Sequence, residues 1–213
     1  MHKVTVIVPV YNAEQCIERC VRSLFEQTLA DIEYIFVDDC TPDKSMEVLE
    51  RVLKEYPERA ESTVIIRHEK NTGQSGARRD GIKAATGEYL IHCDADDWVD
   101  TDMYESMYNK AKEDGVEAVC CDIVLEFDNQ SVTLSVTDEY DDHQMMYDCK
   151  APISVEYFSM CNRLVSREVF ERNTILPFEG VNMWDDVGLA TRVRYYVRST
   201  SAINRGFYHY NRQ

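Results

Sequence analysis

The sequence predicts an α/β fold in which helices cover both faces of a mainly parallel central sheet. Two patterns indicate this fold class: continuous apolar runs typical of strands buried on both faces, and apolar stripes at helical spacing between those runs. Strand and helix alternate in this way through residues 1–115. Such alternation pairs successive strands in parallel, with a helix crossing over between them.

The first strand is predicted at residues 4–8, a β-branched run. Asn12 and Gln15 then have the spacing of a capping box, which predicts the start of a helix. One face of that helix is apolar: Ile17, Cys20, Val21, Leu24 and Phe25.

The second strand is predicted at residues 34–37 and the third at residues 64–66. Between them, Thr41 and Pro42 have the pattern of an N-cap followed by proline at the first helical position, and Pro57 ends the helix. Ser75 is predicted to cap the next helix, which runs to Ala85 and stops at Gly87.

The fourth strand is predicted at residues 89–93, and a helix follows it with a regular buried face: Met103, Tyr104, Met107, Tyr108 and Ala111. The second half of the chain is less regular and predicts a small antiparallel element. Its expected elements are a strand at 118–127, a turn at 128–130 into 131–136, a helix at 187–197 and a late strand at 201–210. The acidic run at 138–142 is expected to be a solvated loop.

Composition limits the classes of partner. The chain has 39 acidic and 23 basic side chains and a formal net charge of −16. This excess of acid argues against nucleic acid as a partner and against polybasic docking on anionic lipid. We expect a cytoplasmic protein, because the apolar runs are too short for a signal peptide or a membrane span. Its eight cysteines are then expected to be reduced, small buried hydrophobes.

Polar residues follow each of the first four predicted strands. In sheets of this kind, ligands bind beyond the carboxyl ends of the strands. The segments that follow the strands are residues 9–12, 38–39, 71–79 and 94–97. The sequence therefore predicts a binding site at this edge of the sheet.

The unit Asp94-Ala95-Asp96 carries the sharpest chemical signal. A strand alternates faces at every residue, so positions 94 and 96 are predicted to point the same way, and their two carboxylates repel each other unless a cation lies nearby. Mg²⁺ and Mn²⁺ prefer such oxygen ligands, together with substrate phosphates. The alternative is a helix N-terminus, where acidic residues are favoured; Asp97 and Asp100 fit that interpretation.

The glycines at 73, 76 and 81 match neither a dinucleotide-binding fingerprint nor a Walker A loop. They predict a loop that approaches a diphosphate with Arg78 and Arg79 nearby, or simple turn chemistry. Asp38 and Asp39 either accept protons from a nucleobase on which Tyr11 stacks, or cap the helix after Thr41. Residue type leaves both alternatives open.

The chain strongly resembles the catalytic domain of glycosyltransferase family 2, which has the GT-A fold. The resemblance rests on five motifs in order: V-P-V-Y-N, V-D-D, N-x-G-x-S-x-A-R, G-E-Y followed by D-A-D-D-W, and N-M-W-D-D. It covers nearly the whole chain and is most specific in the first hundred residues. It implies a single domain, 1–213, with a nucleotide-sugar-binding half (1–115) and an acceptor-binding half (116–213).

The resemblance also implies roles for individual residues. By position, Pro9, Tyr11 and Asp39 would contact the nucleotide base, Asp94 would lie near the ribose and metal, Asp96 would ligate the metal, and Arg78 or Arg79 would hold the diphosphate. The family usually has a Glu-Asp pair at a later helix start. Here the pair is Asp185-Asp186, so Asp186 is the expected catalytic base. His209 is a candidate for the late metal-binding histidine of GT-A enzymes.

The implied activity is inverting, Mg²⁺- or Mn²⁺-dependent transfer of a sugar from a nucleotide-sugar, with UDP the expected nucleotide, to an acceptor hydroxyl. The implied acceptor is a glycan or a lipid-linked glycan at the cytosolic face of the membrane. Peripheral membrane contact is expected through residues that follow Gln213 in the family. Two alternatives stay open: a sugar nucleotidyltransferase, and a non-catalytic nucleotide-binding module of the same fold.

Overall fold

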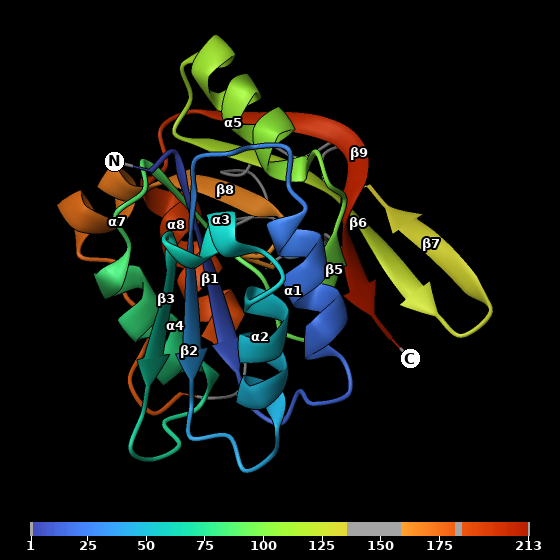
Figure 1. Ribbon diagram of the computed structural model, residues 1–213. Coiled ribbons are helices and arrows are strands. Elements are labelled where there is room, and N and C mark those ends of the chain that lie inside the picture. The colour runs from blue at the N-terminus through green and yellow to red at the C-terminus, as the bar shows by residue number, and fades with distance from the viewer. Residues whose placement is uncertain (1, 136–158, 182–184, 213) are drawn as a thin grey trace.

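The computed structural model of the chain describes residues 2–135, 159–181 and 185–212 (Figure 1). Its helices and strands, in chain order, are β1 (Val4–Val10), α1 (Ile17–Phe25), β2 (Ile32–Asp38), α2 (Ser45–Leu53), α3 (Pro57–Ala60), β3 (Thr63–Arg67), α4 (Gln74–Ala84), β4 (Tyr89–His92), β5 (Trp98–Val99), α5 (Met103–Asp114), β6 (Ala118–Phe127), β7 (Gln130–Leu134), β8 (Arg163–Ser166), α7 (Arg167–Asn173), α8 (Asp185–Tyr196) and β9 (Thr200–Asn211).

Within these residues the strands form one sheet in the order β3-β2-β1-β4-β8-β6-β9-β5, and β7 pairs with β6. β3, β2, β1 and β4 run parallel, and β6 runs parallel to β9. β8 is antiparallel to both of its neighbours, β4 and β6. The β6–β7 hairpin, which projects from the body in Figure 1, and the β5–β9 pair are antiparallel too. The predicted fold class is confirmed, with an antiparallel part larger than expected.

Helices cover both faces of the sheet, as the sequence predicts. Val4, Val6 and Val8 of β1 pack with residues of α1, α2 and α5 on one face. Ile7 packs on the other face with residues of α4, α7 and α8. Successive side chains of a strand point to opposite faces, so burial on both faces explains why this strand is a continuous apolar run.

Two predicted helix starts are wrong, because the residues involved bond to loop residues and do not cap a helix. α1 begins at Ile17, and Asn12 instead adopts a φ of 53° and donates its N–H to Thr41 Oγ1 at 2.8 Å. α2 begins at Ser45, not after Thr41. The Thr41 hydroxyl donates to Asp43 Oδ1 at 2.8 Å. The Asn12–Thr41 bond joins the loop after β1 to the loop after β2.

The glycine and proline predictions are corrected in a similar way. Gly73, with a φ of 79°, precedes α4, so Ser75 lies inside that helix. Gly87 is not the helix stop, because α4 ends at Ala84 and Ala85 is already extended. Glycine is required at position 87 for another reason: a Cβ there would lie 2.6 Å from the backbone nitrogen of Thr5. α2 ends at Leu53, and Pro57 occupies the first position of the short helix α3.

Seven cysteines lie in the described part of the chain, and none of them forms a disulfide. Cys20, Cys93, Cys121 and Cys161 are buried, as expected of small hydrophobes, whereas Cys40 is exposed. The acidic run 138–142 lies outside the described residues. Among the described residues, no helix combines the length and the apolar composition needed to cross a bilayer.

The close approach at Gly87 gives a stability prediction. In Gly87→Ala the new methyl group meets the backbone of Val4 and Thr5 in the centre of the sheet. We expect a loss of about 1–3 kcal/mol in the free energy of unfolding, measured by urea denaturation. The control is Gly115→Asn: Gly115 is left-handed (φ 64°) with open space around it, and asparagine tolerates that conformation. Equal losses in the two variants would contradict the explanation.

Candidate active site

A cavity of about 620 Å³ opens at the carboxyl ends of β1, β2 and β4. Five of the nine predicted site residues line it: Pro9, Tyr11, Asp39, Asp94 and Asp96. Asn71, Gly73 and Gln74 also line it, and so does Tyr210 from the far end of the chain. The rule that ligands bind beyond the strand ends therefore located the cavity correctly.

Asp39 forms part of the cavity wall and fastens the loop that precedes α4. Its Oδ1 accepts bonds from the Thr72 N–H (2.7 Å) and hydroxyl (2.8 Å) and lies 2.8 Å from His68 Nδ1. Its Oδ2 accepts the Gly73 N–H at 2.8 Å. The alternative that Asp38 or Asp39 caps the following helix is wrong: Asp38 accepts the Thr41 N–H, and α2 starts only at Ser45. Sequence reasoning missed His68 and Thr72.

Tyr11 lines the cavity and is about half exposed. Pro9, the sixth residue of β1, lines the same wall. These two residues offer the flat apolar surface that a nucleobase requires.

The segment at residues 94–97 is a turn and not a continuation of β4, so strand alternation does not govern it. β4 ends at His92, and the Asp97 N–H donates to the carbonyl of Asp94 at 3.1 Å. Asp94 and Asp96 nevertheless line the same cavity. Desolvation by the surrounding protein, and then the negative charge of Asp94, raise the pKa of Asp96.

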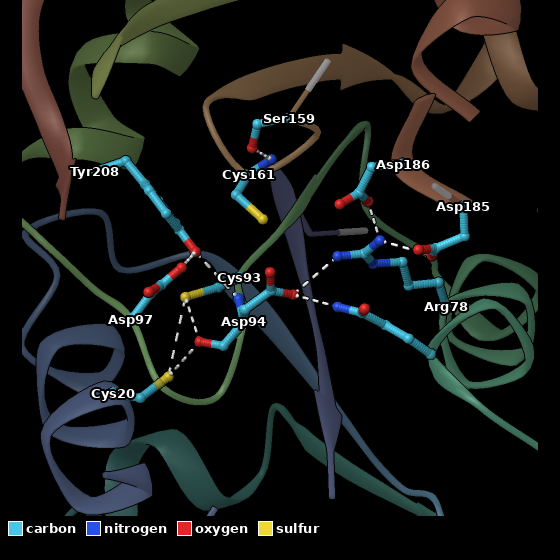
Figure 2. Close-up of polar contacts among 11 residues, drawn as sticks. Cys20, Arg78, Cys93, Asp94, Asp97, Ser159, Cys161, Asp185, Asp186 and Tyr208 are labelled. Carbon is cyan, nitrogen blue, oxygen red and sulfur yellow. Dashed lines mark hydrogen bonds and ion pairs between the residues drawn. The ribbon is translucent and has the colours of Figure 1, made fainter. Parts of the chain in front are cut away.

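Asp97 does not act as a helix N-terminal acid. It is 1% exposed, its Oδ1 accepts the Asn211 N–H at 2.8 Å, and its Oδ2 accepts the Tyr208 hydroxyl (Figure 2). The Tyr208 oxygen in turn accepts the Asp94 N–H at 3.2 Å. Burial, and then the charge of Asp94, raise the pKa of Asp97 to about 8. Strand β9 is thus bonded to the turn that carries Asp94 and Asp96.

Arg78 takes a different place from the one expected of a diphosphate ligand. Its side chain is fully buried and does not line the cavity. Nη2 donates to Asp94 Oδ1 at 2.9 Å, and Nη1 donates to Asp185 Oδ2 at 2.8 Å and to Asp186 Oδ1 (Figure 2). Gln74 Nε2 also donates to Asp94 Oδ1, at 3.0 Å.

Arg79 does not line the cavity either. The next residue of a helix is turned by about 100°, so it projects from another face of α4. Its Nη1 lies 3.3 Å from Glu179 Oε2, and it lines a separate cavity of about 270 Å³ with Asp80 and Lys83. Neither Arg78 nor Arg79 lines the larger cavity in this structure.

Asp185 and Asp186 form the first turn of α8. Asp185 is buried, whereas the Asp186 side chain is about 29% exposed. Arg78 joins both to Asp94, which is 92 residues from Asp186 in sequence. The N-M-W segment of the last motif, residues 182–184, lies outside the described residues.

His209 does not lie with Asp96. Its Nδ1 is 2.7 Å from Glu126 Oε1, its Nε2 is 3.0 Å from Asp100 Oδ1, and its ring stacks on Trp98. Side chains alternate along β9, and it is Tyr210 that lines the cavity. His209 is not among the residues that line the cavity, and its metal role stays a prediction.

The donor set of the cavity fits Mg²⁺ or Mn²⁺ without His209. In the part of the chain that the structure describes, no three His, Cys, Asp or Glu side chains gather as a metal cage. Mg²⁺ needs no such cage, since it binds through one or two carboxylates, waters and substrate phosphates. Asp96 and Asp94 supply those carboxylates at the cavity.

The bonds of Tyr208 give a second prediction. Tyr208→Phe removes the hydroxyl and leaves the buried Asp97 carboxyl and the Asp94 N–H without that partner. We expect a loss of about 1–3 kcal/mol in the free energy of unfolding, measured by urea denaturation. Tyr210→Phe, two residues along the same strand, is the control and should lose less than about 0.5 kcal/mol. A Tyr208→Phe protein as stable as the control would contradict this role.

The sequence matches known proteins over most of its length. The model of the family described as "Glycosyl transferase family 2" matches residues 5–174. EpsH of Bacillus subtilis is 32% identical over 213 residues, 97% of this chain and 60% of that protein. The poly(ribitol-phosphate) beta-glucosyltransferase of Bacillus spizizenii is 40% identical over 114 residues, 52% of this chain and 17% of that protein. The chain thus spans less than two thirds of either relative.

The fold has a counterpart among solved structures. S. aureus TarS (residues 1–349), crystallised in complex with UDP-GlcNAc, superposes with a TM-score of 0.82 at 19% identity. The match covers 99% of this chain and 59% of that one. At this identity the likeness is one of fold.

Proposed function

Because this chain belongs to glycosyl transferase family 2, we propose that it transfers a sugar from a UDP-sugar to an acceptor hydroxyl, with inversion at the anomeric carbon. The observation that carries the proposal is the convergence at one sheet edge. The cavity is lined by Pro9, Tyr11, Asp39 and the Asp94–Asp96 turn, and Arg78 links that turn to Asp186.

The donor nucleotide would occupy the cavity with its base against Pro9 and Tyr11. Asp39, already held by four bonds, presents a fixed acceptor edge to the base. Fixing this carboxylate before the ligand arrives lowers the cost of ordering it on binding. The diphosphate would then extend toward Asp94 and Asp96, which line the same cavity.

Asp96, together with Asp94, would hold Mg²⁺ or Mn²⁺. When bound, such an ion supplies positive charge that stabilises the departing diphosphate. Asp96 lines the cavity and is exposed, so it would be able to meet that group, whereas Asp94 is tied to Gln74 and Arg78 through Oδ1.

Asp186 would act as the catalytic base. Its Oδ1 is anchored to Arg78 and its side chain stays partly exposed, so its second oxygen can accept the acceptor proton. The acceptor oxygen would attack the anomeric carbon from the face opposite the leaving diphosphate, and one displacement inverts that centre.

For the acceptor we propose a cell-surface glycan or a lipid-linked precursor of one, with the enzyme in the cytoplasm at the inner face of the membrane. The support is the poly(ribitol-phosphate) acceptor in the name of the Bacillus spizizenii relative. A sugar nucleotidyltransferase is not retained as an alternative, since the family model covers residues 5–174. A non-catalytic binding module would release no UDP from a UDP-sugar, so the rate losses predicted below would not be seen.

If Asp186 is the base and Asp96 holds the metal, their variants should lose different properties. Asp186→Asn should bind UDP with Mn²⁺ within about 3-fold of the wild-type affinity in isothermal titration. The same variant should lose at least about 10²-fold in release of UDP from a UDP-sugar, since general-base catalysis contributes about 10²–10⁴-fold. Asp96→Ala should instead lose its Mn²⁺-dependent affinity for UDP.

The control for both variants is Asp128→Asn, an exposed residue of the β6–β7 turn, which should change neither quantity. The division of roles is wrong if Asp186→Asn loses UDP affinity as severely as Asp96→Ala.

Donor choice can be tested by thermal unfolding. A ligand that binds the folded state raises its stability by mass action, by about 2.7 kcal/mol at a hundredfold excess over Kd. With Mn²⁺ present, UDP should raise the Tm more than GDP, CDP or ADP at equal concentration. If another nucleotide raises the Tm more than UDP does, that nucleotide is the preferred one and the UDP part of the proposal is wrong.

A further inference from the structure

The buried guanidinium of Arg78 is the contact between the two halves of the site. Its side chain is fully buried, yet the three carboxylates around it come from distant parts of the chain. Asp94 belongs to the turn after β4, and Asp185 and Asp186 belong to the first turn of α8. Figure 2 shows the guanidinium between these groups, with one nitrogen directed to each side.

The charge balance explains why Arg78 keeps this place. Burial opposes a charged guanidinium, but Asp94 and Asp185 outweigh it and raise the pKa of Arg78. Nearby His92 is fully buried, and its pKa is lowered to about 3 by burial and by the charge of Arg78, so it stays neutral. The positive charge of Arg78 is therefore met by the three carboxylates and is not available to a diphosphate in the cavity.

The geometry fixes one oxygen of each functional carboxylate. Nη2 holds Asp94 Oδ1, and Nη1 holds Asp186 Oδ1 while Asp185 accepts from the same nitrogen. A guanidinium is planar and presents its donors in a rigid fork. One rigid group thus sets the separation between the donor side and the base side of the site.

We propose that Arg78 is a positioning residue that aligns Asp186 with the donor bound at Asp94, and that it does not itself bind the diphosphate. The inference rests on the proposed function, because it takes Asp186 as the base. A lysine cannot replace this arginine, since a single ammonium group on a flexible stem cannot span both sides. Misplacement of reacting groups by about 1 Å costs on the order of 10²-fold in rate.

Arg78→Lys is the test, because it keeps the positive charge among the buried carboxylates. An apolar replacement would leave them unpaired and destabilise the fold. With UDP and Mn²⁺ as the binding probe, the Kd of Arg78→Lys should stay within about 3-fold of wild type, because Gln74 still holds Asp94. At saturating UDP-sugar, kcat for UDP release should fall by about 10²-fold or more.

Arg79→Lys is the matched control, the same substitution at the next residue of α4. Arg79 reaches only the exposed Glu179 among its ion pairs in the described residues, so both quantities should stay within about 2-fold of wild type. If Arg78→Lys loses UDP affinity by tenfold or more and keeps its kcat, Arg78 is a diphosphate ligand and the proposal is overturned. Unchanged values of both quantities overturn it as well.

The double variant Arg78→Lys/Asp186→Asn tests whether Arg78 acts through the base. Residues that act as a unit have non-additive effects. The double variant should therefore release UDP within about 3-fold of the rate of Asp186→Asn alone. If the loss of rate in the double variant equals the product of the two single losses, Arg78 does not act through Asp186. Failure of the proposed function is a different result: Asp186→Asn alone would then keep the wild-type rate.

Discussion

Burial of the central strands on both faces is the constraint on which the rest of the structure depends. Ile7 and its neighbours in β1 are fully buried, and β2 and β4 are enclosed in the same way. The acidic residues that line the cavity therefore come from the segments that follow the strands. Because β1, β2 and β4 run parallel, these segments meet at one edge, where the cavity lies.

The loops at that edge hold one another in place by bonds from side chains to backbone. Asp43 accepts bonds from the Ser45 hydroxyl and N–H, from the Glu14 N–H and from the Thr41 hydroxyl. Burial opposes its ionisation, but these bonds outweigh burial and lower the pKa of Asp43 to about 2. Asp39 holds a second loop in the same way, by accepting the N–H groups of Thr72 and Gly73. The cavity wall is therefore ordered before a ligand enters it.

The features that could be predicted from sequence are those set by the spacing of apolar residues and by the order of the strands along the chain. The apolar runs located the strands, and the strand ends located Asp39, Asp94 and Asp96. Whether Arg78 or Arg79 faces inward depends on the rotation of α4 against the sheet, which residue type does not encode. The side to which His209 projects could not be predicted for a related reason: a strand residue faces one side only, and pairing with β5 and β6 decides which side.

Pairing of distant strands also explains why the two halves of the chain form one site. β8 lies between β4 and β6, and β9 returns to pair with β5, which belongs to the first half. Asp97 holds β9 to the turn at Asp94, while Arg78 holds α8 to the same turn. The turn is thus bonded from two sides by segments that follow residue 184. The first half alone would lose both sets of bonds, so we infer that residues 1–115 do not form the site by themselves.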